Sequence, residues 1–204
     1  MASSSLWTMM WFRPRVVIRT LLENSPQYRM TFLIVFGGMA QALSNSANQN
    51  LGDWISTGQL ILICLLVGPL GGLVSLYLMA WVIQQVSQRM GGKANTAELR
   101  TAIAWSWVPL VTVLPLWIPR LILFKDELFK SKTPMIDSIT TLSHLYDISV
   151  FIDQAVAIWS MVLLYAAVSE ANQFSIFKGV ASVLISSILI ALPLLIFISI
   201  FMPV

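Results

Sequence analysis

Two charges of opposite sign stand out because each lies in or beside an apolar stretch. Asp153 is the only charged residue between Ile148 and Ser169, and Arg120 follows the apolar stretch that ends at Pro119. An ionisable side chain inside a membrane is costly, and a functional site is the default interpretation. Asp153, with Gln154 beside it, could hold a proton or a cation, or could pair with Arg120. A purely structural ion pair, or an acid shallow enough to stay hydrated, would explain the same residues.

A second polar group follows the same stretch at its other end. Glu170 opens a short polar turn that ends at Lys178, and we expect this turn to face the earlier turn around Lys93. The functional interpretation is a cytoplasmic recognition surface or a gate, and the alternative is an ordinary hairpin whose polar groups satisfy helix ends. With the basic residues near the N-terminus, the candidate partner surface comprises Arg13, Arg15, Arg19, Lys93, Glu98, Arg100, Glu170 and Lys178.

No catalytic, metal-binding or cofactor-binding signature accompanies these groups. The chain has one histidine, His144, and one cysteine, Cys64, so it lacks the Cys/His cluster of a zinc site. It has no GxSxG nucleophile motif, and "GGKAN" lacks the spacing of a phosphate-binding loop. The sequence therefore predicts a protein that is not an enzyme and that needs no cofactor or metal.

The composition is that of a membrane protein. Of the 204 residues, 57% are hydrophobic and only 10% are charged, against about 25% charged residues in a soluble domain. The net charge of +3 is not concentrated in the basic face that nucleic-acid binding requires. We therefore expect an all-α, multi-pass integral membrane protein and no nucleic-acid partner.

Uncharged stretches predict the elements that position these residues. We expect an N-terminal segment, 1–27, followed by a five-helix transmembrane domain, 28–204. The spans are expected at about 28–43, 57–88, 101–120, 147–169 and 179–202, with a bend at Pro69 and a surface helix within 125–146. With the N-terminus inside, eight basic residues lie on the cytoplasmic side and four outside, which favours an N-in, C-out topology.

The segment that begins at Pro14 predicts an amphipathic helix. Val17, Ile18, Leu21 and Leu22 share one face, and Arg15 and Arg19 lie on another, with Glu23 placed for an i,i+4 pair with Arg19. Such a helix is expected to lie on the membrane and to attract anionic lipid headgroups. A docking surface for a soluble partner is the other interpretation, and the two are compatible.

Small residues in the second span predict close helix packing. Gly68 and Gly72 have GxxxG spacing, with Gly71 between them, and such residues allow helix backbones to approach each other. We favour packing within the bundle over a homo-oligomer interface, although the spacing suits both.

Three stretches and the five-span order together resemble the Yip membrane domain family, named for Ypt/Rab GTPase-interacting proteins, and its bacterial branch in particular. The stretches are "WFRPRVVIRTLLENSPQYRMTFLIVFGG" (11–38), "GGKANTAELRTAIAWSWVPL" (91–110) and "IWSMVLLYAAVSEANQFSIFKGV" (158–180). The resemblance implies a five-helix domain with a cytoplasmic N-terminus, here in the bacterial cytoplasmic membrane. In eukaryotic members it implies vesicle trafficking and Rab GTPase association, but the Asp-Leu-Tyr-Gly-Pro-like motif of those members is absent from this chain.

Two functions follow from these residues. The first is a non-enzymatic membrane adaptor or organiser that binds protein partners or lipids at its cytoplasmic face. The alternative is a small transporter or channel for an ion, a lipid or a small solute that uses Asp153 in the membrane.

Overall fold

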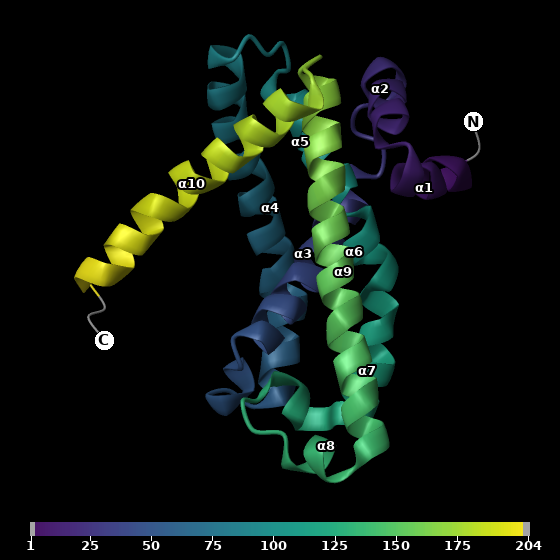
Figure 1. Ribbon diagram of the computed structural model, residues 1–204, viewed down its shortest axis with the longest axis vertical. Helices are drawn as coiled ribbons and strands as arrows, with labels where there is room; N and C mark the ends of the chain where they lie inside the picture. The colour runs from purple at the N-terminus through teal and green to yellow at the C-terminus, as the bar shows by residue number, and fades with distance from the viewer. Residues whose placement is uncertain (1–2, 202–204) are drawn as a thin grey trace. The chain divides into compact units, whose positions relative to one another are not determined.

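A computed structural model describes residues 3–201, and every regular element in that range is helical (Figure 1). The longest helices are α3 (Met30–Asn48), α4 (Thr57–Arg89), α9 (Thr140–Ala171) and α10 (Ile176–Phe201). The shorter elements are α1 (Ser3–Phe12), α2 (Pro14–Asn24), α5 (Thr96–Ser106), α6 (Val108–Val113), α7 (Trp117–Phe124) and α8 (Pro134–Ser138), with 3-10 turns η1 (Leu51–Asp53), η2 (Leu114–Leu116) and η3 (Lys125–Phe129). The predicted end of the fifth span, at Met202, lies outside the described residues.

The chain divides into two compact units, and α4 and α9 contribute to both. Unit 1 comprises Met1–Met30, Ser75–Ser106 and Val162–Val204, and unit 2 comprises Thr31–Val74 and Trp107–Met161. Their charges differ. Unit 1 has eight basic and three acidic residues, a net charge of +5, whereas unit 2 has four basic and six acidic residues, a net charge of −2.

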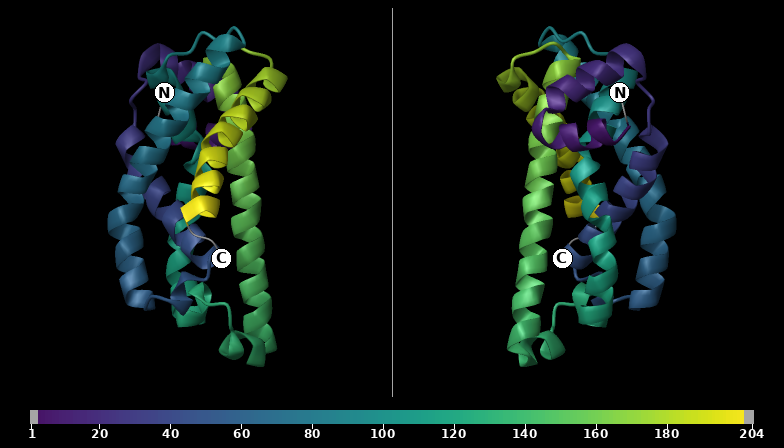
Figure 2. Two further views of the ribbon diagram at one scale, coloured as in Figure 1. Left: turned by 90° about the vertical axis from the view of Figure 1, so that its left-hand side faces the viewer. Right: turned by 90° about the vertical axis from the view of Figure 1, so that its right-hand side faces the viewer.

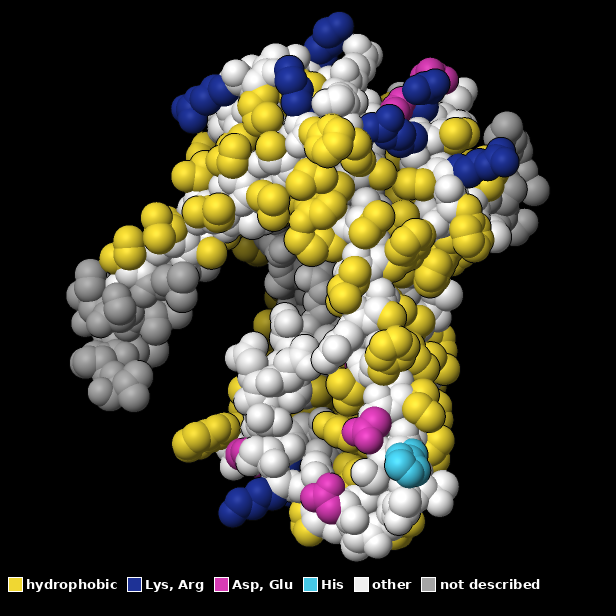
Figure 3. Space-filling model, viewed as in Figure 1, with side chains coloured by type: hydrophobic (Ala, Val, Ile, Leu, Met, Phe, Trp, Pro, Cys, Tyr) yellow, Lys and Arg dark blue, Asp and Glu magenta, His cyan; other side chains and the backbone are white. Residues whose placement is uncertain are grey.

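Four helical stretches among the described residues are long and apolar enough to cross a membrane. They are Thr57–Arg89, Thr96–Phe129, Thr140–Ala171 and Ile176–Pro193. Many large apolar side chains on these stretches are exposed, among them Leu66, Leu70 and Ile188, and Figure 3 shows such side chains over much of the visible surface. Exposed apolar surface on this scale is stable only where lipid or another apolar partner covers it.

The second of these stretches is not the single helix expected at 101–120. It begins earlier, at Thr96, and it is divided into α5, α6, η2, α7 and η3. Pro109, Pro115 and Pro119 fall in the divided part, and each proline removes a backbone N–H and clashes with the preceding turn of an α-helix. The prolines therefore explain the breaks after Ser106.

The segment before the fourth span also differs from expectation. Instead of one surface helix within 125–146, it forms η3 and α8, and α9 already begins at Thr140 rather than near Asp147. Figure 2 shows α9 as one unbroken helix. Asp153 consequently lies about three and a half turns from the start of this helix, whereas a span that begins at residue 147 would place it less than two turns from the start.

In unit 2, α3 packs against α4 through glycines. A Cβ atom on Gly38 would collide with the carbonyl oxygen of Gly68, and a Cβ atom on Gly72 would lie 2.8 Å from the Cα atom of Gly38. Gly71, in contrast, has nothing within 4 Å of its Cβ position. Two of the three glycines singled out in the sequence thus bring α4 close to α3, and the third points away from this contact.

In unit 1, the amphipathic helix α2 packs on α5. Val17, Ile18 and Leu21 are buried, and Leu99 and Ile103 of α5 are buried as well. Three of the four residues of the apolar face of α2 are therefore covered by protein, and the location of α2 on the membrane surface stays a prediction. The hydrophobic effect is not directional, so an apolar helix face with this residue pattern can be buried against lipid or against protein.

Candidate functional sites

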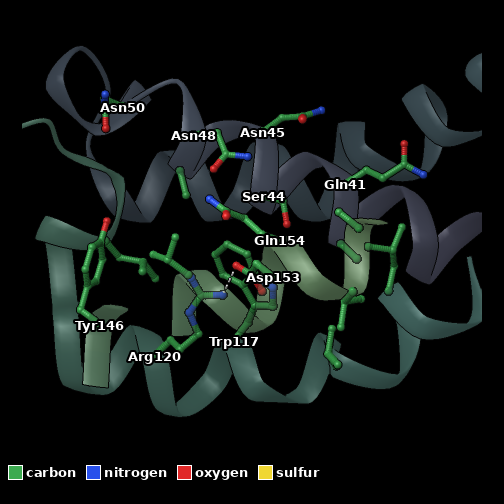
Figure 4. A pocket seen from close by; sticks show the side chains of 18 residues that line it. Gln41, Ser44, Asn45, Asn48, Asn50, Trp117, Arg120, Tyr146, Asp153 and Gln154 are labelled. Carbon is green, nitrogen blue, oxygen red and sulfur yellow. Dashed lines mark hydrogen bonds and ion pairs between the residues drawn. The ribbon is translucent and has the colours of Figure 1, made fainter. Parts of the chain in front are cut away.

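The first candidate site is a polar pocket inside unit 2. It is a cavity of about 430 Å³ between α3, α7 and α9 (Figure 4). Its polar walls are formed by Gln41, Ser44, Asn45, Asn48, Asn50, Tyr146, Asp153, Gln154 and Arg120, with Trp117 beside Arg120. The three residues predicted from the sequence as an intramembrane polar site, Asp153, Gln154 and Arg120, thus all line one cavity.

Arg120 and Asp153 form an ion pair in this pocket. Arg120 Nη1 donates a hydrogen bond to Asp153 Oδ2 at 2.5 Å. Arg120 is only 7% exposed, and its guanidinium lies over the ring of Trp117, 4.3 Å from the ring centroid. The Nε atom of Arg120 is buried and has no hydrogen-bond partner among the described residues. The pair and the aromatic ring hold the guanidinium in place and leave one of its donors unused.

The opposite wall of the pocket comes from the second half of α3. Gln41, Ser44, Asn45 and Asn48 recur at i, i+3, i+4 and i+7, so they share one face of the helix. Leu43, on another side of the same helix, packs in the apolar core of unit 2. Gln154 extends from α9 toward this wall (Figure 4). The sequence analysis noted no site here, although the helical spacing of these polar residues was the available signal.

The second candidate site is the loop end of unit 1, where α2 meets the end of α9. Arg15 Nη2 donates a hydrogen bond to Ser169 Oγ at 2.8 Å, and Arg19 Nε donates one to Glu170 Oε1 at 2.7 Å. Arg19 therefore pairs with Glu170 and not with Glu23, the partner expected from the sequence, because the last turn of α9 brings Glu170 next to α2.

The two polar turns predicted to face each other do meet. Asn172 Oδ1 accepts a hydrogen bond from Ala94 N at 3.3 Å, and Lys178 Nζ donates one to the carbonyl oxygen of Met90 at 3.2 Å. Gly92 fits between them because a Cβ atom there would collide with Asn172 Oδ1. The loop end of unit 1 is thus one connected surface of α2 and both turns.

Some of the other residues predicted for this surface have partners within unit 1, and others have none among the described residues. Glu98 forms a reciprocal capping pair with Asn95 at the start of α5, and the guanidinium of Arg100 lies 4.5 Å from the centroid of the Tyr77 ring. Arg13 and Lys93 are exposed, and their side chains form no hydrogen bond or ion pair with any described residue. Arg89, which the sequence analysis did not single out, is also exposed, and its side chain forms no hydrogen bond or ion pair with any described residue. Figure 3 shows basic side chains gathered on the visible face of this end of unit 1.

The chain was compared with known proteins in three ways. Neither the comparison with curated proteins nor the comparison with solved structures gave a match. The comparison with protein families matched the Yip1 domain over residues 7–198, which covers nearly the whole chain and includes both candidate sites. Members of this family are generally non-catalytic membrane proteins. The chain is therefore a multi-pass integral membrane protein that belongs to the Yip1 domain family.

Proposed function

We propose that this chain is a non-enzymatic membrane adaptor or organiser that holds an acidic partner at the loop end of unit 1. The observation that carries the proposal is the surplus of positive charge there. Unit 1 has a net charge of +5, and the exposed side chains of Arg13, Arg89 and Lys93 are not used within the described part of the chain. Complementary charge steers and orients binding partners.

The same charge distribution supports the membrane arrangement that the proposal needs. Cytoplasmic loops carry an excess of Lys and Arg, so the loop end of unit 1 faces the cytoplasm and the topology is N-in, C-out. The bacterial branch of the family and the bacterial cytoplasmic membrane complete the proposal, on the basis of the stretches at 11–38, 91–110 and 158–180. Anionic lipid headgroups would meet the same free basic side chains at the membrane surface.

We place α3 in the membrane as the remaining span. Its first half is apolar, and Gly38 contacts α4 at Gly68 and Gly72, inside a stretch that is long and apolar enough to span. A helix in backbone contact with this part of α4 lies at the same depth. The polar half of α3 is tolerated there because it lines a pocket.

The adaptor proposal predicts the loss of a partner on charge reversal. Arg15 and Arg19 are poor choices for this test because they hold α2 in place. Arg13→Glu combined with Lys93→Glu changes only free groups, and we expect recovery of the partner to fall about tenfold or more. The measurement is affinity purification of the full chain from native membranes in mild detergent, with mass spectrometry of proteins and lipids.

The matched control reverses two exposed lysines of unit 2, Lys125→Glu with Lys132→Glu. The control should retain every partner of the wild-type protein. If both double variants recover the same proteins as the wild type, the loop end of unit 1 is not the docking surface.

A small transporter or channel is the second candidate function, and the polar pocket of unit 2 is the observation that favours it. Transporters place polar substrate sites within the membrane, at breaks in helices such as the one that precedes α7. This candidate predicts that Asp153→Asn changes solute flux in liposomes while the protein stays folded. Unchanged flux would exclude Asp153 from any transport mechanism.

A further inference from the structure

We infer that the pocket of unit 2 binds a neutral polyol, that is, a sugar ring or similar hydroxyl-rich group, either free or as the headgroup of a glycolipid. This inference goes beyond the adaptor proposal and concerns binding alone. It does not require that the ligand be carried across the membrane.

The first argument is the number of unused hydrogen-bonding groups on the pocket walls. Six polar side chains form no hydrogen bond with any residue in the described part of the chain, and these are Gln41, Ser44, Asn45, Asn48, Asn50 and Gln154. The buried Nε atom of Arg120 is likewise unpartnered among the described residues. Three of the six, Gln41, Ser44 and Asn50, are partly buried, and on the proposed placement of α3 in the membrane unpaired polar groups cost free energy, so a polar ligand that fills the cavity would satisfy this set.

The second argument is the chemistry of these groups. Five of the six are carboxamides, each of which both donates and accepts hydrogen bonds, and the sixth is a hydroxyl group. A hydroxyl-rich ligand also donates and accepts at every position, so it can satisfy walls of this kind from several directions. A metal cation binds only the oxygen atoms, and an ionised carboxylate only accepts hydrogen bonds, so each of them would leave part of every carboxamide unused.

The third argument is the charge of the pocket. Among the described residues that line it, Arg120 and Asp153 are the only charged ones, and they neutralise each other. An anion that binds Arg120 would be repelled by Asp153 beside it, and a cation that binds Asp153 would be repelled by Arg120. The pocket therefore favours a ligand without net charge.

Size and shape agree with this ligand class. The volume of about 430 Å³ lies within the range of about 300–1,000 Å³ that is typical of small-molecule sites. Leu110, Val113 and Val156 add apolar patches to the polar walls, and the C–H faces of a sugar ring can pack against such patches.

The test is a binding measurement on the full chain in nanodiscs of phosphatidylcholine, after purification in an amine-oxide detergent that carries no sugar. The probes are glucose, as a free polyol, and monoglucosyl diacylglycerol, as a glycolipid. Inorganic phosphate and phosphatidylethanolamine are the charged and zwitterionic comparators. If both glucosyl probes bind, the pocket recognises the glucosyl group whether or not it is attached to a lipid. If the glycolipid binds and glucose does not, the ligand is a lipid headgroup. Absence of binding by both glucosyl probes overturns the inference, and so does equal or tighter binding of either comparator.

Two variants assign the binding to the pocket. Asn45→Leu and Gln154→Leu remove one carboxamide each from opposite walls, and both side chains are exposed enough for the substitutions to leave the fold intact. Each is expected to weaken glucosyl binding by about tenfold. Gln49→Leu is the matched control because Gln49 is exposed next to α3 and does not line the pocket. Equal affinity in all three variants would overturn the assignment.

Discussion

Replacing Arg120 by methionine is expected to lower the free energy of unfolding by about 3–5 kcal/mol, because a partly buried carboxylate loses the one charged partner that it has among the described residues. The side chain of Asp153 is 26% exposed, which places the effect in the lower part of that range. The same change removes the contact between the guanidinium and the Trp117 ring. The measurement is an SDS titration in mixed micelles that follows the helical signal.

A double variant separates the ion pair from general packing. Arg120→Met combined with Asp153→Leu removes both charges, so the double variant is expected to be more stable than Arg120→Met alone. If the double variant loses as much free energy of unfolding as Arg120→Met and Asp153→Leu lose when added together, Arg120 and Asp153 do not stabilise each other. The pocket would then be held together by its apolar contacts alone.

Composition and charge predicted a membrane protein because the fraction of charged side chains reflects the solvent that surrounds the protein and not the way in which its helices pack. A chain with 10% charged residues cannot keep its surface in water, and the helical membrane protein follows from that fact. The polar turns around Lys93 and Glu170 could also be placed together in advance, since both follow spans that were predicted to end on the same side. The charges of Arg120 and Asp153 were individually conspicuous for the same reason, because each interrupts or borders an apolar stretch.

What the sequence could not reveal was the choice between equivalent partners. The apolar face of α2 suits lipid and protein equally, and only the presence of α5 decides that protein covers it. Arg19 has Glu23 one turn away, yet it pairs with Glu170 from a distant part of the chain. Local spacing identifies candidates for such pairs, whereas tertiary packing selects among them.

The polar pocket shows a different limit. The polar residues in the second half of α3 were the reason for predicting a short first span, at 28–43. In the structure the same residues lie on one face of a helix that continues to Asn48, opposite Gln154 and Arg120. Periodicity could have revealed the shared face of α3, but no local pattern reveals which helices form the other walls.

Adding a single methyl group at Gly38 is expected to destabilise the protein by about 1–3 kcal/mol, because the new Cβ atom overpacks the contact between α3 and α4. The atoms that it would meet are backbone atoms, the carbonyl oxygen of Gly68 and the Cα atom of Pro69 at 3.1 Å. Backbone cannot rotate away as a flexible side chain does, so α3 must move from α4. The measurement is the free energy of unfolding of Gly38→Ala in the same SDS titration.

Gly71→Ala is the matched control for Gly38→Ala, since Gly71 has open space around its Cβ position and lies in the interior of α4. Alanine is about 0.8–1.0 kcal/mol more favourable than glycine inside a helix, so the control is expected to be neutral or slightly stabilising. Equal effects of the two substitutions would show that α3 does not approach α4 closely. That result would also remove the reason for placing α3 at the depth of α4, because the glycine contact is what fixes the polar half of α3 beside the membrane-spanning helices.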